Sequence, residues 1–514
     1  MDQQELFKPV PRHKLESLTH EQMIEFMEVQ QKVIEDIQKD NDRLKNLYEQ
    51  LRQKKLRIEE QFITLKNKYF GKSSEKEPSN KDRQKNLDGQ NKKNKKVQLP
   101  SDRYPEAPLI ERDVELEETP SCKCCGSQMT DSGLTENSEF LTAIPTQFMV
   151  IRQKRHKYRC GKCHGDVQTA PAPPRISPGS SYSDEMIIDV AMSKYCDLIP
   201  IERYASMAGR QGLMDLPPQS LIEQTHKLAN FVYGAYQGLR SEALCSRTLQ
   251  ADETPHRMLE GSEKKNWHLW GFSTPETSFF EIHDTRSGDV ASDLLRDSAC
   301  QYLISDVFSG YNKAVTQANK ERKSLNRPLI KNVYCNAHAR RKFKTAAERF
   351  PEESQYFVDM YKKIYRLEKI AQARPPDRVV RVRRYMKSLF EQMKNNAMQQ
   401  VSGYSSKSSI GKAMNYFLKN YDQLTLFIDH GFLPIDNNLQ ERLLRSPVVG
   451  RKTWYGTHSK RGAQTAACLF SLVESCKLNG INPRDYFKTL VENLHAGKEP
   501  FTPKQFKSSH PDVG

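Results

Sequence analysis

Three carboxylates in the second half of the chain have the residue type and local context that metal-dependent phosphate chemistry needs. Asp252 lies in the run "LQADET", which is typical of a β-strand, and Asp306 ends the strand-like run "QYLISD". Glu441 follows in "DNNLQERLLRSPVVGRK", where a helix is expected to begin with Asp436 near its N-cap. Carboxylate oxygens hold Mg²⁺ while leaving positions open for water and phosphate. Two such ions about 3.5–4 Å apart activate an attacking oxygen and stabilise a leaving one.

The elements that must position these carboxylates are a mixture of strands and helices. From residue 247 the pattern predicts the order β-β-β-α-β-β-α, with one helical turn after Asp306. In a sheet of the ribonuclease-H type, the first and fourth strands are neighbours, so Asp252 and Asp306 would face each other. Glu253 would point to the opposite strand face, which favours a structural role. Spacing alone leaves open that these are solvated strand-end or helix-cap carboxylates.

Two cysteine pairs form a second candidate site. Cys122 and Cys125 make one C-x-x-C, and Cys160 and Cys163 make another. Two such turns complete a four-coordinate zinc site, whereas the alternative is coincidental cysteines in a reduced core. Cys124 is a spare that could replace a neighbour. A closed site of this type is structural, and it would present to DNA phosphates the basic residues Arg152, Lys154, Arg155 and Lys157.

Several smaller patterns surround the carboxylates. Cys335 and His338 form a C-x-x-H at a strand-to-helix junction, which is either a packed pair or part of a metal site. Trp454 and Tyr455 either stack on exposed bases or belong to the core. Basic residues expected to meet phosphate flank these patterns, namely Arg340, Arg341, Arg442, Arg445, Arg451, Lys452 and Arg461.

Composition narrows the class of protein. The chain has 514 residues, with 80 Lys and Arg against 64 Asp and Glu, so its formal charge of +16 favours a polyanionic partner such as nucleic acid. Residues 337–435 alone hold 19 basic and 9 acidic residues, a net charge of 19 − 9 = +10. No apolar run is long enough to span a membrane, and the N-terminus lacks a signal-peptide core. Eleven cysteines without an export signal indicate a reducing compartment, so a cytoplasmic protein is expected.

The N-terminal region has a heptad pattern. Apolar residues recur every seven positions at Ile37, Leu44, Leu51, Ile58 and Leu65. This predicts a coiled coil, and Asn41 at an a position favours a dimer. The alternative is one long amphipathic helix that packs on its own chain.

The whole chain is predicted to be a multidomain α+β protein. Its expected parts are a coiled coil over 1–70, a basic linker over 71–100, a zinc-binding domain over 101–175, a helical DNA-binding or connecting region over 176–246, a first core part over 247–350, a basic helical insertion over 351–433, a mixed second core part over 434–495, and a tail over 496–514 that is loose after Pro500.

These motifs together resemble the transposases of bacterial insertion sequences of the IS sixty-six family, which are DDE transposases. The matching runs include "KYFGKSSEK", the cysteine pairs, "SKYCDLIPIERY", "LQADETP", "ISDVFSGY", "CNAHARRKF", "DNNLQERLLRSPVVGRKTWYGTHSKRGA" and "SLVESCKLNGINPRDYF", in the family's order over roughly residues 20–495. The first cysteine cluster departs from the family's frequent C-P-x-C-G and reads "CKCCG". The resemblance implies a leucine-zipper-like N-terminus and a ribonuclease-H-like catalytic core with a helical insertion. It also implies that Asp252, Asp306 and Glu441 are the DDE residues.

The expected function is metal-dependent cleavage of the element's ends and strand transfer into target DNA. The cofactors would be two Mg²⁺ or Mn²⁺ ions at the carboxylates and a structural Zn²⁺. The partners would be terminal inverted repeats, target DNA, a second protomer and, in the family, accessory element-encoded proteins. The rival functions are a non-enzymatic zinc-containing repressor or inactive relic, a ribonuclease-H-like nuclease that never joins strands, and a cytoskeletal coiled-coil protein.

Overall fold

The computed structural model divides the chain into two compact units, Met1–Ala143 and Ile144–Gly514. It describes residues 167–259 and 266–510 without interruption. Shorter described stretches are 99–103, 124–125, 127–128, 138–141 and 147–159. Isolated residues between 19 and 43 are also described, and nearly all of them are helical. Most of the predicted coiled coil therefore lies outside the described residues.

The described part of the first unit is small. Helix α4 (Pro100–Arg103) carries Ser101, whose backbone N–H and hydroxyl both donate to the Glu139 carboxylate at 2.8 and 2.9 Å.

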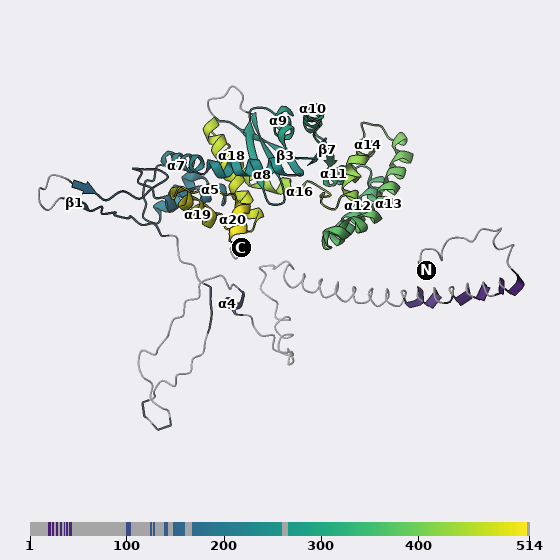
Figure 1. Ribbon diagram of the computed structural model, residues 1–514, viewed down its shortest axis with the longest axis horizontal. Helices are drawn as coiled ribbons and strands as arrows, with labels where there is room; N and C mark the ends of the chain where they lie inside the picture. The colour runs from purple at the N-terminus through teal and green to yellow at the C-terminus, as the bar shows by residue number, and fades with distance from the viewer. Residues whose placement is uncertain are drawn as a thin grey trace, which may run out of the picture. The chain divides into compact units, whose positions relative to one another are not determined.

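A five-stranded mixed sheet forms the centre of the second unit (Figure 1). Its strands are β3 (Thr248–Arg257), β4 (Asn266–Ser273), β5 (Ser278–His283), β6 (Tyr302–Ser305) and β7 (Lys331–Tyr334). They lie in the order β5-β4-β3-β6-β7, in which the first three are antiparallel and β6 and β7 run parallel to β3. The prediction that the first and fourth strands are neighbours is confirmed, because β3 pairs directly with β6.

The two faces of β6 contribute to two different hydrophobic cores, whereas both faces of β4 and β5 pack into the first one. Leu249, Ala251 and Leu303 pack into one core, whereas Tyr302 and Ile304 pack into the other. This alternation follows from the two-residue period of a strand, in which successive side chains point to opposite faces.

The first core is completed by helices from both ends of the second unit. They are α5 (Asp184–Tyr195), α7 (Pro218–Phe231), α8 (Tyr233–Cys245), α9 (Asp289–Asp297), α10 (Ser309–Ser324), α18 (Lys460–Leu478) and α19 (Pro483–His495), whereas α6 (Ile201–Gly209) packs in a small separate core beside α5 and α7. Helix α18 packs along the edge strand β5, where the Ser471 and Ser475 hydroxyls accept hydrogen bonds from β5 backbone N–H groups at 2.8 and 2.9 Å.

The second core is built mainly by the predicted helical insertion. Its helices are α11 (Asn336–Ala346), α12 (Pro351–Gln372), α13 (Pro376–Gln400), α14 (Ser409–Lys419) and α15 (Tyr421–Thr425), which Figure 1 shows beyond β7. The predicted break at Pro375 and Pro376 separates α12 from α13, as expected of residues that cannot continue a helix. A buried ion pair between Arg383 and Glu368 at 2.5 Å joins these two helices.

Three local predictions were wrong. The single turn expected after Asp306 is the 16-residue helix α10, so the order is β-β-β-α-β-α-β-α. The block 434–495 is helical throughout rather than mixed, with α16 (Asn438–Leu443) and α17 (Arg445–Trp454) preceding α18. The tail after Pro500, which was predicted to be loose, contains helix α20 (Pro503–Ser509). This helix begins with a capping box at Thr502 and buries Phe506.

Candidate active site

Asp252 and Asp306 lie just beyond the last paired residues of two parallel strands, Asp252 within β3 and Asp306 directly after β6. The register pairs Gln250 with Ile304, and its continuation by two residues sets Asp252 beside Asp306. Asp252 has the parity of Gln250, opposite to Leu249 and Ala251, so its side chain leaves the sheet on the same face as Ile304 of the neighbouring strand. Asp306 follows β6 directly, and its Oδ1 accepts a hydrogen bond from the Phe308 N–H at 3.0 Å.

Glu441 reaches the same face from helix α16. Two buried amides fix this helix against the sheet. The Asn437 side chain donates to the Ala251 carbonyl at 2.9 Å, next to Asp252. Gln440 is fully buried against β4 at Gly271, where a Cβ atom would lie only 2.0 Å from the Gln440 Nε2. The two amides thus bring a helix from the end of the chain onto the strands that carry the aspartates.

The electrostatics of Asp252 show how close the acidic groups are. Burial, together with the charges of Glu253, Asp306 and Glu441, raises the pKa of Asp252 to about 7. The Glu253 backbone N–H, which donates to Asp252 Oδ1 at 2.9 Å, opposes this rise. Like-charged carboxylates disfavour each other's ionised form, and a bound cation would remove that penalty.

Glu253 points into the first core and is held by the protein. Its Oε2 accepts from the Tyr311 hydroxyl at 2.7 Å, and its Oε1 accepts from Arg286 at 2.6 and 2.9 Å. Burial raises the pKa of Glu253, while these hydrogen bonds oppose the rise. Both oxygens therefore have protein donors, in agreement with the predicted structural role on the opposite face from Asp252.

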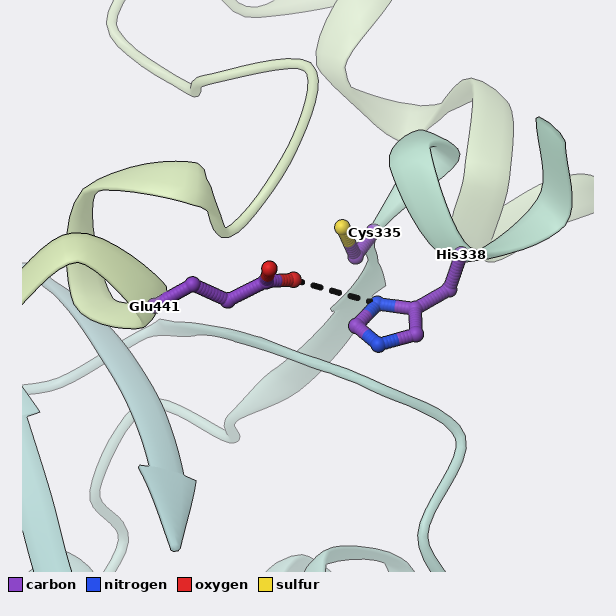
Figure 2. Close-up of side chains that lie close together, drawn as sticks. All are labelled: Cys335, His338 and Glu441. Atoms are coloured by element: carbon purple, nitrogen blue, oxygen red, sulfur yellow. Dashed lines mark ion pairs between the residues drawn. The ribbon is translucent and has the colours of Figure 1, made fainter. Parts of the chain in front are cut away.

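Cys335 and His338, which the sequence left as either a packed pair or part of a metal site, lie next to Glu441. Figure 2 shows the Glu441 carboxylate extending towards the His338 ring, with the Cys335 thiol beside the gap. Glu441 Oε1 is 3.7 Å from His338 Nδ1, and Oε2 is 3.5 Å from Arg341 Nη2. The Asn437 N–H donates to Cys335 Sγ at 3.2 Å. Burial lowers the pKa of His338 and raises the pKa of Cys335 to about 12.

The residues present fit a divalent cation at the carboxylates. Asp252, Asp306 and Glu441 offer the all-oxygen donor set that Mg²⁺ and Mn²⁺ prefer. Glu441 Oε1 is a buried atom without a hydrogen-bond partner among the described residues. A buried polar atom of this kind calls for a missing partner, and a metal ion is one that a carboxylate accepts.

The predicted DNA-binding residues divide into exposed and engaged groups. Four arginines or lysines near the site are exposed, namely Arg341, Arg442, Arg445 and Lys452, and of these Arg341 also pairs with Glu441. The other three contact protein groups, although Arg461 is exposed as well. Arg340 lies over the Tyr365 ring, Arg451 donates to Thr254 at 3.0 Å, and Arg461 forms a bidentate pair with Glu223 at 2.8 Å.

The two neighbouring aromatic residues have different environments. Trp454 is half-buried and stacks on Phe470 at 6.5 Å between ring centroids, as the core alternative predicted. Tyr455 is 71% exposed, and its backbone has the left-handed φ of 64°. The next residue, Gly456, approaches the Arg257 carbonyl so closely that a Cβ atom would lie 2.1 Å from its oxygen. The backbone thus anchors this loop to β3 while the Tyr455 ring faces solvent.

The cysteine pairs are only partly described. Cys122, Cys160 and Cys163 lie outside the described residues, whereas Cys124 and Cys125 are exposed thiols at a turn. In sequence, the Cys160–Cys163 pair falls between β1 (Lys157–Arg159) and β2 (Val167–Thr169), which pair antiparallel. Arg152, Lys154, Arg155 and Lys157 are all exposed. In the part of the chain that the structure describes, no helix combines the length and apolar character that crossing a membrane requires.

Comparison with known proteins gives three relatives from Sinorhizobium fredii (strain NBRC 101917 / NGR234). The chain is 24% identical to the uncharacterized protein y4hP over 409 residues, which are 75% of this chain and 72% of that one. It is 26% identical to y4jD over 399 residues, 75% of this chain and 77% of that one. It is 27% identical to y4qI over 404 residues, 73% of this chain and 70% of that one. All three similarities extend over most of both chains.

The family comparisons cover both candidate sites. Residues 119–164 match the model described as the zinc-finger binding domain of transposase IS66, and this range contains all four cysteines of the predicted zinc site. Residues 179–465 match the model described as the transposase IS66 family, and this range contains Asp252, Asp306 and Glu441. The second match covers more than half of the chain, so this protein belongs to the IS66 family of transposases.

Proposed function

We propose that this transposase works by a DDE mechanism on a ribonuclease-H-like core, with Asp252, Asp306 and Glu441 as the ligands of catalytic metal. The observation that carries the proposal is the convergence of these three carboxylates on one sheet face, from the middle of β3, the carboxyl end of β6 and helix α16. The strand order β5-β4-β3-β6-β7, with three antiparallel strands followed by two parallel ones, supports the fold assignment.

Each carboxylate has a distinct part in this proposal. Asp252 lies within β3 and Asp306 directly follows β6, and the two would hold a divalent ion between them. Glu441 would close the site from α16, whose position depends on the buried Asn437 and Gln440. Bound Mg²⁺ or Mn²⁺ supplies an activated oxygen nucleophile and neutralises the leaving oxygen.

The remaining residues would position DNA. The exposed cations Arg341, Arg442 and Arg445 lie on the helices that carry or contact Glu441, where they can bind phosphates on either side of the scissile bond. Cleavage frees a 3′-OH at the element's end, and this hydroxyl attacks a target phosphodiester in line. One phosphodiester bond forms as another breaks, so no covalent enzyme intermediate and no nucleotide cofactor are required.

The zinc-finger-type domain would bind its ion through Cys122, Cys125, Cys160 and Cys163. The support is the doubled C-x-x-C spacing within the matched range 119–164. The exposed basic residues at 152–157, just before the second pair, would then be presented to the terminal repeats.

A strand-joining assay tests the proposed function. Purified protein is incubated with Mg²⁺, a labelled DNA carrying the inverted repeat that borders the gene, and a target plasmid. We expect label to enter the plasmid covalently. Cleaved but never joined ends would instead favour the ribonuclease-H-like nuclease, and binding without any cleavage would favour a repressor.

A further inference from the structure

A second set of metal-ligand side chains shares Glu441 with the carboxylate site. Cys335, His338 and Glu441 each offer one ligand atom, and the three atoms lie within 4.8 Å of one another (Figure 2). His338 Nδ1 and Glu441 Oε1 are both buried and have no hydrogen-bond partner among the described residues. Two orphaned buried atoms that face each other point to an absent ligand between them.

The spacing of these atoms suits a metal ion better than a hydrogen bond. His338 Nδ1 and Glu441 Oε1 are 3.7 Å apart, which is too long for a hydrogen bond. In tetrahedral zinc the bonds to nitrogen and oxygen are about 2.0–2.2 Å, which places two such ligand atoms about 3.3–3.5 Å apart. The observed separation of 3.7 Å is close to this edge, so a small movement of either side chain would bring both atoms into coordination.

The donor types select the metal. Mg²⁺ prefers oxygen ligands, whereas an imidazole nitrogen and a thiolate sulfur favour zinc. The two donors that distinguish this set, Cys335 and His338, come from the end of β7 and the first turn of α11 and are fixed by the fold. The Asn437 N–H, which donates to Cys335 Sγ at 3.2 Å, would orient and stabilise a thiolate ligand.

We propose that Cys335, His338 and Glu441 form a second, inhibitory zinc site, in which zinc captures the third carboxylate and withholds it from the catalytic metal. Water takes the fourth position. The Cys335 thiol loses its proton to solvent when zinc binds, and nothing is oxidised or reduced. The inhibition rests on the proposed function, whereas the zinc binding does not.

Zinc content tests the site independently of activity. The full-length protein is equilibrated with zinc, separated from free metal and measured by elemental analysis. Cys335→Ala and His338→Gln should each hold one zinc per chain fewer than the wild type. Two controls should keep the wild-type content, namely Asp252→Asn, which alters only the carboxylate site, and Cys300→Ala, which removes a buried thiol elsewhere. Wild-type zinc content in both Cys335→Ala and His338→Gln would overturn the proposal.

Strand joining in Mg²⁺ tests the inhibition. Added zinc should inhibit strand joining by the wild type. For each protein, the zinc concentration that halves its own zinc-free rate is measured, and this concentration should be at least tenfold higher for Cys335→Ala than for the wild type. Equal zinc sensitivity of the two proteins would overturn the inhibitory role. If the wild type joins no strands at all, the proposed function fails and the inhibitory role fails with it, while the zinc content still decides whether the site exists.

Discussion

The negative charge of Asp252, which metal binding requires, lowers the stability of the metal-free protein. Its pKa of about 7 in the folded chain lies above the ordinary aspartate value of 3.8. Between these two values the folded state holds a proton that the unfolded state has released, so the free energy of unfolding falls as pH rises from about 4 to 7. Above pH 7 the full destabilisation remains unless a cation binds.

Asp252→Asn should therefore stabilise the metal-free protein. In magnesium-free buffer at pH 8, we expect the free energy of unfolding to rise by roughly 2–4 kcal/mol, and the gain should shrink as the pH is lowered towards 4. Mg²⁺ should stabilise the wild type at pH 8 and leave the variant unchanged. Denaturant unfolding at several pH values measures both effects, and a variant less stable than the wild type at pH 8 would contradict this account of the site.

Substitution of Trp454 should affect stability, whereas substitution of Tyr455 should affect DNA binding. Trp454→Ala removes a ring from the core and should cost about 3 kcal/mol of unfolding free energy. Tyr455→Ala should leave stability nearly unchanged but weaken binding to single-stranded element ends about tenfold, the value of one stacking contact. Tyr385→Ala removes another exposed tyrosine, 70% exposed on α13, and is the matched control. Equal DNA affinity of Tyr455→Ala and Tyr385→Ala would show that Tyr455 does not stack on bases.

At this scale, residues with a strong local pattern could be predicted and residues that depend on distant contacts could not. Asp252 lies within one strand and Asp306 directly follows another, and both strands could be recognised from their local sequence patterns. Cys335 and His338 could not be joined to Glu441, because the third member arrives on a helix after the whole insertion. Asn437 and Gln440 were also missed as the residues that fix this helix. The polar run "DNNLQER", just before an apolar stretch, was the available signal.

Among the elements, α16 determines whether the site is complete. It has six residues and depends on Gln440 fitting beside Gly271 of β4. Any side chain at position 271 must displace Gln440 or the Phe280 ring, whose Cε1 would lie 3.0 Å from the new Cβ. Displacement of Gln440 would also move the adjacent Glu441.

Gly271→Ala should therefore impair both stability and catalysis. We expect a loss of about 1–3 kcal/mol in unfolding free energy from overpacking, together with slower strand joining. Gly462→Ala in the first turn of α18, where the nearest atom is 3.5 Å from the added Cβ, should be neutral or slightly stabilising. Denaturant unfolding and joining rates measure both variants, and a fully active Gly271→Ala protein would show that α16 tolerates displacement.

Helices with weak apolar patterns are the elements that sequence reasoning missed. Helix α10 is mostly polar, and much of its buried face consists of small residues such as Ala314 and Ala318. Helix α20 is short, but it is stabilised by the Thr502 capping box and by the edge-to-face contact of Phe506 with Tyr486 of α19, whose ring centroids are 5.8 Å apart. Strands β4, β5 and β6 were predicted closely, because their apolar runs are continuous and bounded by turn residues.

In the second unit as a whole, the carboxylate site lies on the sheet face that carries Ile304 of the second core and receives α16. The first core holds the strands together, and α11, which begins directly after β7, brings Cys335, His338 and Arg341 to the carboxylates. This arrangement explains how 441 − 306 − 1 = 134 residues can separate Asp306 from Glu441 without disturbing the sheet.

Assembly should depend on the N-terminal heptads. Removal of residues 1–70 deletes Ile37, Leu44, Leu51 and the later heptad positions, so we expect the remaining chain to be folded and monomeric. Strand joining should fall more than end binding, because two element ends must be held in one complex. Analytical ultracentrifugation compares the truncated and full-length proteins, and an unchanged oligomer would place the main interface elsewhere.

The central claim is that Asp252, Asp306 and Glu441 together hold the metal that cuts and joins DNA. The decisive measurement is Mg²⁺-dependent strand joining by Asp252→Asn, Asp306→Asn and Glu441→Gln, with Glu253→Gln as the control that alters a carboxylate bound to Arg286 and Tyr311. Each of the three variants should bind element ends but join them on the order of a hundredfold or more slowly, whereas Glu253→Gln should retain most activity. A Glu441→Gln protein that joins ends at the wild-type rate would contradict the account.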